Sequence, residues 1–239
     1  MAFARARSAP DVDDPQGSAP SSLGRRVVAT FVSPSALFAA FRDHAPWVAP
    51  LLISMAVGIL VIALLPDETF TVGMEHAVNR RGVPVEITSD TATIARWERI
   101  RLAFGVVVTQ PVIAGVIAGL LTLAFSILLR GEARYRQYLA VTTHSFLISA
   151  VGALIVLPLQ LTYADPEIRL SPTLLLPGLA DAGFVGRFLD GINLFSIWML
   201  VVVALGVTAV NRRRSAALPI MLVLGLYLAL VTTRAAIAG

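Results

Sequence analysis

The chain of 239 residues contains neither cysteine nor lysine. Without cysteine, the protein can form no disulfide bond, no thiolate metal site and no cysteine nucleophile. All 19 basic residues are arginines, which we interpret as the coding bias of a GC-rich bacterial genome. The net charge is +4, but the arginines flank apolar runs instead of alternating with aromatic residues on one surface. The charge therefore does not indicate a nucleic-acid partner.

Charge of either sign is scarce in this sequence. Charged residues make up 14% and hydrophobic residues 56%, whereas about a quarter of the residues of a soluble domain are charged. Five runs contain no Asp, Glu, Arg or Lys, and each is long enough to cross the ~30 Å hydrocarbon core as a helix. We therefore predict an all-α, polytopic integral membrane protein with a bundle of five transmembrane helices. The five runs are residues 45–66, 102–129, 137–164, 191–211 and 215–233.

The segments outside the five runs differ in composition. Residues 1–30 are rich in Ser, Pro, Ala and Asp and are predicted to form a disordered cytoplasmic tail, which leaves residues 31–239 as the membrane domain. The segment SPSALFAAFRDH (33–44) begins with Ser-Pro and carries apolar residues at helical spacing. It predicts a short amphipathic helix in the membrane interface before the first span. Residues 170–184 are apolar but short and bounded by prolines, so they are predicted to lie on the surface or to re-enter without spanning.

Arginines in the short loops between spans determine membrane orientation. The loops RGEARYR (130–136) and NRRRS (211–215) carry six arginines and a single acid, Glu132. We therefore place both loops in the cytoplasm with the N-terminus and place the C-terminus outside, in a bacterial inner membrane. The arginines serve orientation alone, or they also contact anionic lipid headgroups or an unknown membrane protein partner. The six residues are Arg130, Arg134, Arg136, Arg212, Arg213 and Arg214.

Only one residue in the five runs titrates near neutral pH, and it is His144. It is either a proton site or a neutral histidine that hydrogen-bonds a neighbouring helix or a backbone carbonyl. We favour the second alternative because no carboxylate lies in the runs to partner it. The sequence has no HExxH motif, no acidic pair within the spans, no phosphate loop and no dinucleotide fingerprint. We predict that the protein is not an enzyme and binds no metal or cofactor.

Three amide side chains, Gln110, Gln160 and Asn193, lie near the predicted outer ends of their helices. They are expected to converge as a polar layer near a kink at Pro111. Such a layer either forms a substrate vestibule or makes ordinary hydrogen bonds between helices, and we favour the hydrogen bonds.

Small residues at a spacing of four predict close helix packing. Gly115 and Gly119 form a GxxxG pattern in the second run, and Ser54 and Gly58 form a looser one in the first. The contacts are made either within one chain or between two chains, and we favour contacts within one chain.

Resemblance to a known family rests on three segments: SPSALFAAFRDHAPWVAPLLI, LLRGEARYRQYLAV and LDGINLFSIWMLVVVALGV. They are similar to the Yip domain proteins, the Ypt/Rab-interacting family, in their bacterial form. The resemblance implies five spans with a cytoplasmic N-terminus. Eukaryotic members bind small GTPases in vesicle traffic, whereas bacterial membership implies no defined activity. Early in the third span, where the family has an aromatic residue followed by a proline, this chain has THSFLIS.

Two functions remain open from the sequence. The first is a non-enzymatic, multi-pass membrane protein of Yip type that binds or organises membrane partners or lipids. The alternative is a small transporter or permease subunit with a polar site near the outer leaflet. A water-filled cavity that reached Gln110 or His144 would favour the transporter, and close-packed spans would favour the first function.

Overall fold

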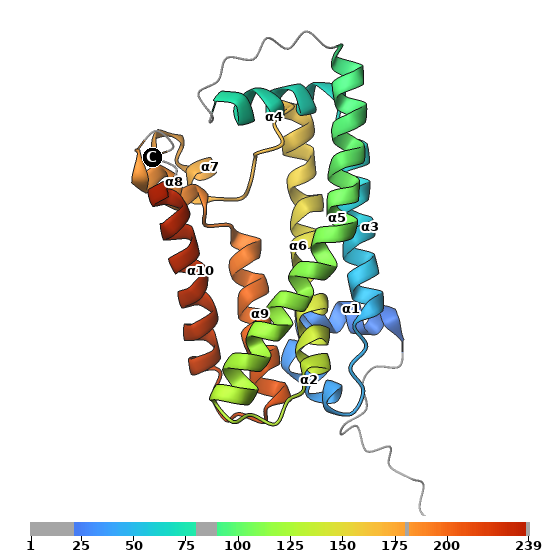
Figure 1. The fold of residues 1–239 in the computed structure, drawn as a ribbon, viewed down its shortest axis with the longest axis vertical. Coiled ribbons are helices and arrows are strands. Elements are labelled where there is room, and N and C mark those ends of the chain that lie inside the picture. The colour runs from blue at the N-terminus through green and yellow to red at the C-terminus, as the bar shows by residue number, and fades with distance from the viewer. Residues whose placement is uncertain (1–21, 80–89, 180–181, 238–239) are drawn as a thin grey trace, which may run out of the picture.

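The computed structural model describes residues 22–79, 90–179 and 182–237, and every regular element in these ranges is a helix (Figure 1). By length and composition, three of the helices could each cross a membrane, and the number rises to five if two bent helix pairs each count as one span. The protein therefore has an all-α, polytopic membrane fold, as predicted. The three long helices are α5 (Thr91–Leu121) with its π-helical continuation η2 (Thr122–Leu128), α6 (Tyr135–Tyr163) and α10 (Ala217–Ile237).

The two bent pairs account for the first and fourth predicted spans. Helix α3 (Val48–Leu64) is followed after Pro66 by α4 (Asp67–Asn79), at an angle of 94°. Helix α8 (Phe184–Asp190) precedes α9 (Leu194–Val210) at an angle of 54°. Arg99 of α5 fastens α4 across the end of the bundle, because it forms an ion pair with Asp67 at 2.6 Å and its guanidinium lies over the Phe70 ring.

The N-terminal helices differ from their prediction in two respects. Helix α1 (Leu23–Val32) lies in the segment predicted as a disordered tail, so that boundary was wrong; residues 1–21 lie outside the described residues. Helix α2 (Pro34–Ala39) and the 3-10 turn η1 (Ala40–Arg42) form where a helix was predicted. Their apolar side chains, however, do not face lipid: Phe38 and Phe41 are 0% exposed and pack inside the bundle.

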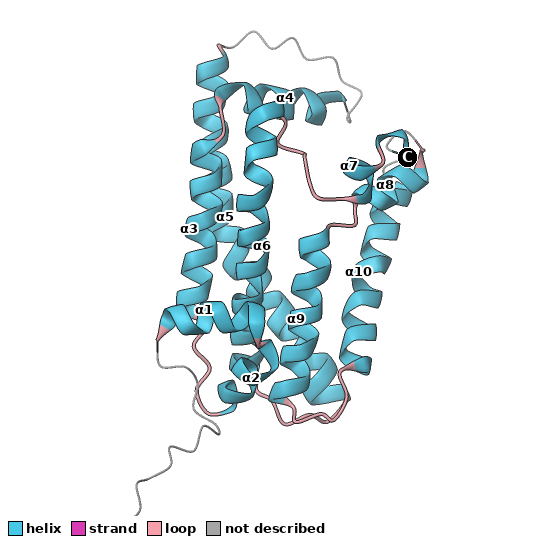
Figure 2. Cartoon of the chain, turned by 180° about the vertical axis from the view of Figure 1, so that it is seen from behind, coloured by secondary structure: helices cyan, strands magenta, loops and turns pink. Residues whose placement is uncertain are grey.

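Helix α6 lies at the centre of the fold, where it packs against α3, α5 and α9 (Figure 2). Every side chain from residue 140 to residue 148 is buried. In the same views α10 lies on the far side of α9 from α6. The short helices α7 (Pro172–Leu175) and η3 (Pro177–Leu179) lie beside the C-terminal end of α10 and do not span, as predicted.

Two glycines permit the close approach of α6 and α9. A Cβ atom on Gly152 of α6 would lie 2.5 Å from the Phe195 ring, and one on Gly206 of α9 would collide with Val141 and Phe38. Neither glycine was identified from the sequence, because neither belongs to a GxxxG pattern. The two contacts hold the helices together near both ends of α9.

The predicted packing glycines behave differently. A Cβ on Gly119 would meet nothing within 4 Å, and one on Gly115 would meet only the Tyr135 hydroxyl at 3.3 Å. Packing of this pair within the chain was therefore a wrong prediction, since in this part of α5 the residues with 0% exposure are Ala114 and Ala118, each one position earlier. In the looser pattern Ser54 is buried, and a Cβ on Gly58 would make ordinary contact with Val106 of α5 at 3.5 Å. This second pattern does join α3 to α5.

The contact at Gly206 predicts a specific loss of stability. Gly206→Ala should lower the free energy of unfolding by roughly 1–3 kcal/mol, because an added methyl group overpacks the interface. The measurement is the midpoint of thermal unfolding in detergent. Gly225→Ala in α10 is the matched control, since a Cβ there would meet nothing within 4 Å. Equal midpoints for the two variants would contradict the close approach of α6 and α9.

Candidate functional site

The two arginine-rich loops lie side by side at one end of the bundle (Figure 1). Five of their six arginines are exposed, and Glu132 is the only acid in either loop. We call this surface the basic end and define it by these five residues. They are Arg130, Arg134, Arg136, Arg212 and Arg214.

Asn211, at the C-terminal end of α9, joins the two loops. Its side-chain oxygen accepts a hydrogen bond from the Ala133 backbone N–H at 3.3 Å. Its side-chain nitrogen donates to the Tyr138 hydroxyl at 2.9 Å and to the Val207 carbonyl at 2.8 Å. Asn211 and Tyr138 are both buried, so these bonds are shielded from water. Asn211 was not identified from the sequence, although its position at the end of an apolar run, where helix carbonyls lack partners, is a usable signal.

The sixth arginine, Arg213, contacts the bundle instead of projecting from the loop. Arg213 is partly buried, its guanidinium lies 5.7 Å from the centre of the Phe125 ring, and it donates to the Leu129 carbonyl at 3.5 Å. A cation over an aromatic face is attracted by the ring quadrupole. Arg213 therefore holds the 211–215 turn against η2, while Arg212 and Arg214 project from it.

His144 is enclosed by aromatic side chains. It is 1% exposed, and its ring centre lies 4.7 Å from that of Phe41 and 6.3 Å from that of Phe38. Its Nδ1 atom lies 2.8 Å from the Ala140 carbonyl oxygen, a distance at which Nδ1–H donates to that oxygen. This arrangement agrees with the packing alternative.

The three amides do not form one layer, so that expectation was wrong. Gln110 donates to the Ser54 hydroxyl at 3.0 Å and so joins α5 to α3. Gln160 donates to the carbonyls of Pro166 and Ile168, at 3.1 and 3.3 Å, and fastens the loop that follows α6. Asn193 caps α9, because its side-chain oxygen accepts from the backbone N–H groups of Phe195 and Ser196, the second and third helical residues, at 2.8 and 3.2 Å.

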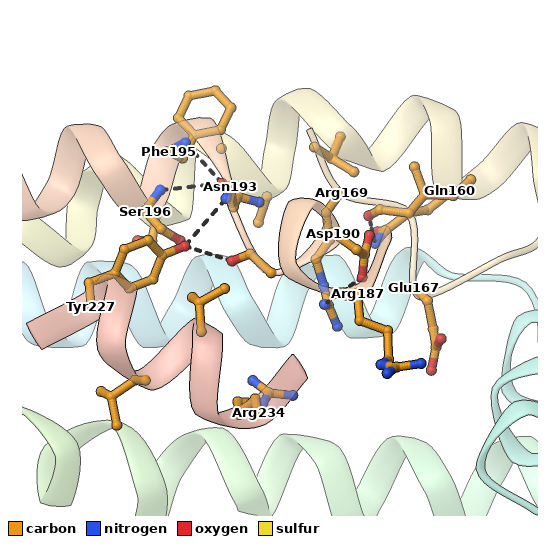
Figure 3. Close-up of a pocket in the computed structure, with 18 of the residues that line it drawn as sticks. Gln160, Glu167, Arg169, Arg187, Asp190, Asn193, Phe195, Ser196, Tyr227 and Arg234 are labelled. Carbon is orange, nitrogen blue, oxygen red and sulfur yellow. Dashed lines mark hydrogen bonds and ion pairs between the residues drawn. The ribbon is translucent and has the colours of Figure 1, made fainter. Parts of the chain in front are cut away.

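Gln160 and Asn193 do meet at a cavity of about 910 Å³, at the opposite end of the bundle from the basic end (Figures 1 and 3). The cavity lies among α3, α6, α8, α9 and α10 and the loop that follows α6. On its α10 wall, the Tyr227 hydroxyl donates to the Gly191 carbonyl at 2.7 Å and accepts from the Asn193 backbone N–H at 3.3 Å. Tyr227 thereby ties α10 to the start of α9.

Charged side chains gather at one end of this cavity (Figure 3). Arg169 lies 3.8 Å from an Asp190 carboxylate oxygen, and the other oxygen of that carboxylate accepts from Ser171 and Thr173. Arg187 donates from Nε to the Ala235 carbonyl at 2.9 Å. The three cavity arginines were not identified as site residues from the sequence, because the folding of α8 against α10 cannot be read from spacing.

Comparison with known families supports the resemblance drawn from the sequence. A family model described as the Yip1 domain matches residues 28–233. The chain belongs to the Yip1 domain family. No curated protein and no solved structure matches the chain. The matched region contains both loops of the basic end and α2 to α9 complete.

The contacts of Asn211 predict that its replacement in this Yip1 domain lowers the stability of the whole fold and loosens the 211–215 turn. Asn211→Leu leaves the Ala133 N–H without its partner and removes two of the hydrogen bonds of the Tyr138 hydroxyl, which keeps only Ser126 at 3.0 Å, and this should lower the free energy of unfolding by about 1–3 kcal/mol. The midpoint of thermal unfolding should fall, and trypsin should cut the 211–215 turn faster. Arg212→Gln is the control and should shift the midpoint little, because its side chain is exposed. Unchanged midpoint and cleavage rate in Asn211→Leu would contradict the role of this residue.

Proposed function

We propose that this Yip1 domain protein is a non-enzymatic membrane protein that gathers anionic lipid headgroups at its basic end, on the cytoplasmic side of a bacterial inner membrane. The observation that carries the proposal is the meeting of two loops with five exposed arginines and one acid. An arginine near an anionic membrane surface contributes about 1 kcal/mol. Five of them on one rigid surface therefore supply a substantial attraction without any cofactor.

The geometry of the loops supports recognition beyond simple orientation. Arginines that only orient a helix need no fixed arrangement, because orientation depends on their number near the helix ends. Here Asn211 and Arg213 hold both loops in place. The exposed guanidinium groups are thus presented on a preorganised surface, which reduces the entropy lost on binding.

An acidic membrane protein partner would use the same chemistry as a lipid headgroup. Carboxylate and phosphate groups both accept paired hydrogen bonds from a guanidinium. The lipid is the simpler proposal because it is present along the whole membrane surface next to the loops.

The cavity lined by Gln160 and Asn193 does not supply the observation that would favour the transporter alternative. The residues that line the cavity include neither Gln110 nor His144. Gln110 is engaged with Ser54 between α3 and α5, and His144 is enclosed by Phe38 and Phe41. A binding function therefore accounts better for these polar groups.

Orientation is tested with reporters. A reporter fused after Gly239 should be active only outside the cytoplasm, and one inserted in the 211–215 turn only inside. The reason is that arginine-rich short loops are retained in the cytoplasm and that α10 separates the turn from the C-terminus. Cytoplasmic activity of the C-terminal fusion would refute the proposed orientation.

Lipid recognition is tested with charge variants. The protein is placed in nanodiscs of zwitterionic lipid and tethered by a C-terminal tag, and binding of anionic liposomes is measured. The double variant Arg212→Gln and Arg214→Gln should weaken this binding about thirtyfold, because two contacts of about 1 kcal/mol each are lost.

The matched control has the same change of charge at the other end of the bundle. The double variant Arg96→Gln and Arg101→Gln, whose side chains are exposed near the start of α5, should keep the liposome binding of the unaltered protein. Correct insertion is checked with the reporters. If the Arg212 and Arg214 variant is correctly inserted and binds as tightly as the unaltered protein, the docking role is refuted.

A further inference from the structure

We propose that the cavity at the opposite end of the bundle binds one anionic amphiphile of the phospholipid class. Its acidic headgroup lies against Arg187 and Arg234, and one acyl chain lies along the apolar lining between α6, α9 and α10. This site is separate from the basic end and does not depend on the function proposed above.

The charges of the lining favour an anion. Three arginines and two acids line the cavity. One acid, Asp190, already accepts hydrogen bonds from Ser171 and Thr173 and lies 3.8 Å from Arg169. Among the described residues, Arg187 and Arg234 have no carboxylate partner. Guanidinium groups suit phosphate because their N–H groups match its oxygen atoms in pairs.

The two arginines come from different helices and line the same cavity. Arg187 of α8 is partly buried and donates from Nε to the carbonyl of Ala235, the residue that follows Arg234 in α10. Arg234 is exposed, and within the described chain it makes no hydrogen bond or ion pair. Both line the cavity, as Figure 3 shows. An anion held there would neutralise both guanidinium groups.

The remainder of the lining favours a hydrocarbon chain. Val156 of α6, Phe195 of α9, and Leu230 and Val231 of α10 all line the cavity. Leu230 and Val231 lie about one helical turn from Arg234, or ~5 Å along the axis. A ligand that satisfied the arginines alone would leave this apolar surface uncovered. An amphiphile covers both parts of the lining, because its charged headgroup can lie at the arginines while its hydrocarbon chain lies along the apolar residues.

Access from the membrane explains how such a ligand could enter. Leu230 is 57% exposed although it lines the cavity, and Ile155 of α6, next to the lining residue Val156, is 52% exposed. Both lie on helices long and apolar enough to span a membrane. These exposed apolar residues allow a lipid to approach the cavity from the side of the bundle, and the volume of about 910 Å³ is sufficient for a headgroup and part of one chain.

The experiment measures ligand binding to the purified full chain in detergent. Dioleoyl phosphatidylglycerol, dioleoyl phosphatidylcholine and inorganic phosphate are titrated separately, and binding is followed by native mass spectrometry and by the thermal midpoint. A bound ligand raises the midpoint through mass action. We expect one phosphatidylglycerol per chain, bound about thirtyfold more tightly than phosphatidylcholine, because two arginines at about 1 kcal/mol each recognise the acidic headgroup.

Two variants separate the charged and apolar parts. Arg234→Gln should abolish most of the preference for phosphatidylglycerol, and it should fold normally because Arg234 has no partner among the described residues. Leu230→Trp should weaken binding of the lipid by filling its chain site. Leu228→Trp is the matched control, because Leu228 is exposed on the same helix but does not line the cavity.

The outcomes distinguish this site from the basic end. Loss of the preference in Arg234→Gln but not in Arg212→Gln with Arg214→Gln supports the cavity. The reverse pattern overturns it, and so does equal binding of the two lipids. A different result is that inorganic phosphate raises the thermal midpoint as much as phosphatidylglycerol does, with no effect of Leu230→Trp. That result would show a site for a free anion and would overturn the proposal of an amphiphile.

Discussion

The close approach of α6 and α9 is the contact on which the positions of α10 and of both sites depend. Gly152 admits the Phe195 ring near one end of α9, and Gly206 admits Val141 and Phe38 near the other. Helices embedded in lipid gain little from the hydrophobic effect when they associate, so they depend on close van der Waals contact at small residues. Because α9 also packs on α10, its seating against α6 determines where the last span lies.

The two sites follow from the two ends of α9. Asn193 precedes this helix and Asn211 follows it. The N–H groups at the start of a helix and the C=O groups at its end have no partner within the helix. In an apolar environment, nearby side chains have to supply these hydrogen bonds. At one end Asn193 and Tyr227 meet this need beside the cavity. At the other end Asn211 binds the Val207 carbonyl and then joins the loops of the basic end. Each site is therefore built around a helix terminus that already required polar side chains.

The polar groups between the helices serve mainly the bundle itself. Gln110 bonds Ser54, and His144 bonds the Ala140 carbonyl within an aromatic enclosure. The Arg42 guanidinium donates twice to the Ala209 carbonyl near the end of α9, at 2.8 and 3.1 Å, which attaches the N-terminal segment to the bundle. Together with the burial of Phe38 and Phe41, this contact holds α2 against the bundle.

The sequence by itself determined the fold class, the positions of the apolar helices, the two arginine loops and the family, because these depend on local composition and on length relative to the bilayer. Only the tertiary structure decided which small residues pack: the GxxxG pattern predicted Gly115 and Gly119, whereas Gly152 and Gly206 make the close contacts. It alone separated Gln110 from Gln160 and Asn193, and brought Arg187 beside α10. Spacing along one helix predicts which residues share a face. Which neighbouring helix that face contacts depends on how the two helices pack, and spacing does not show this.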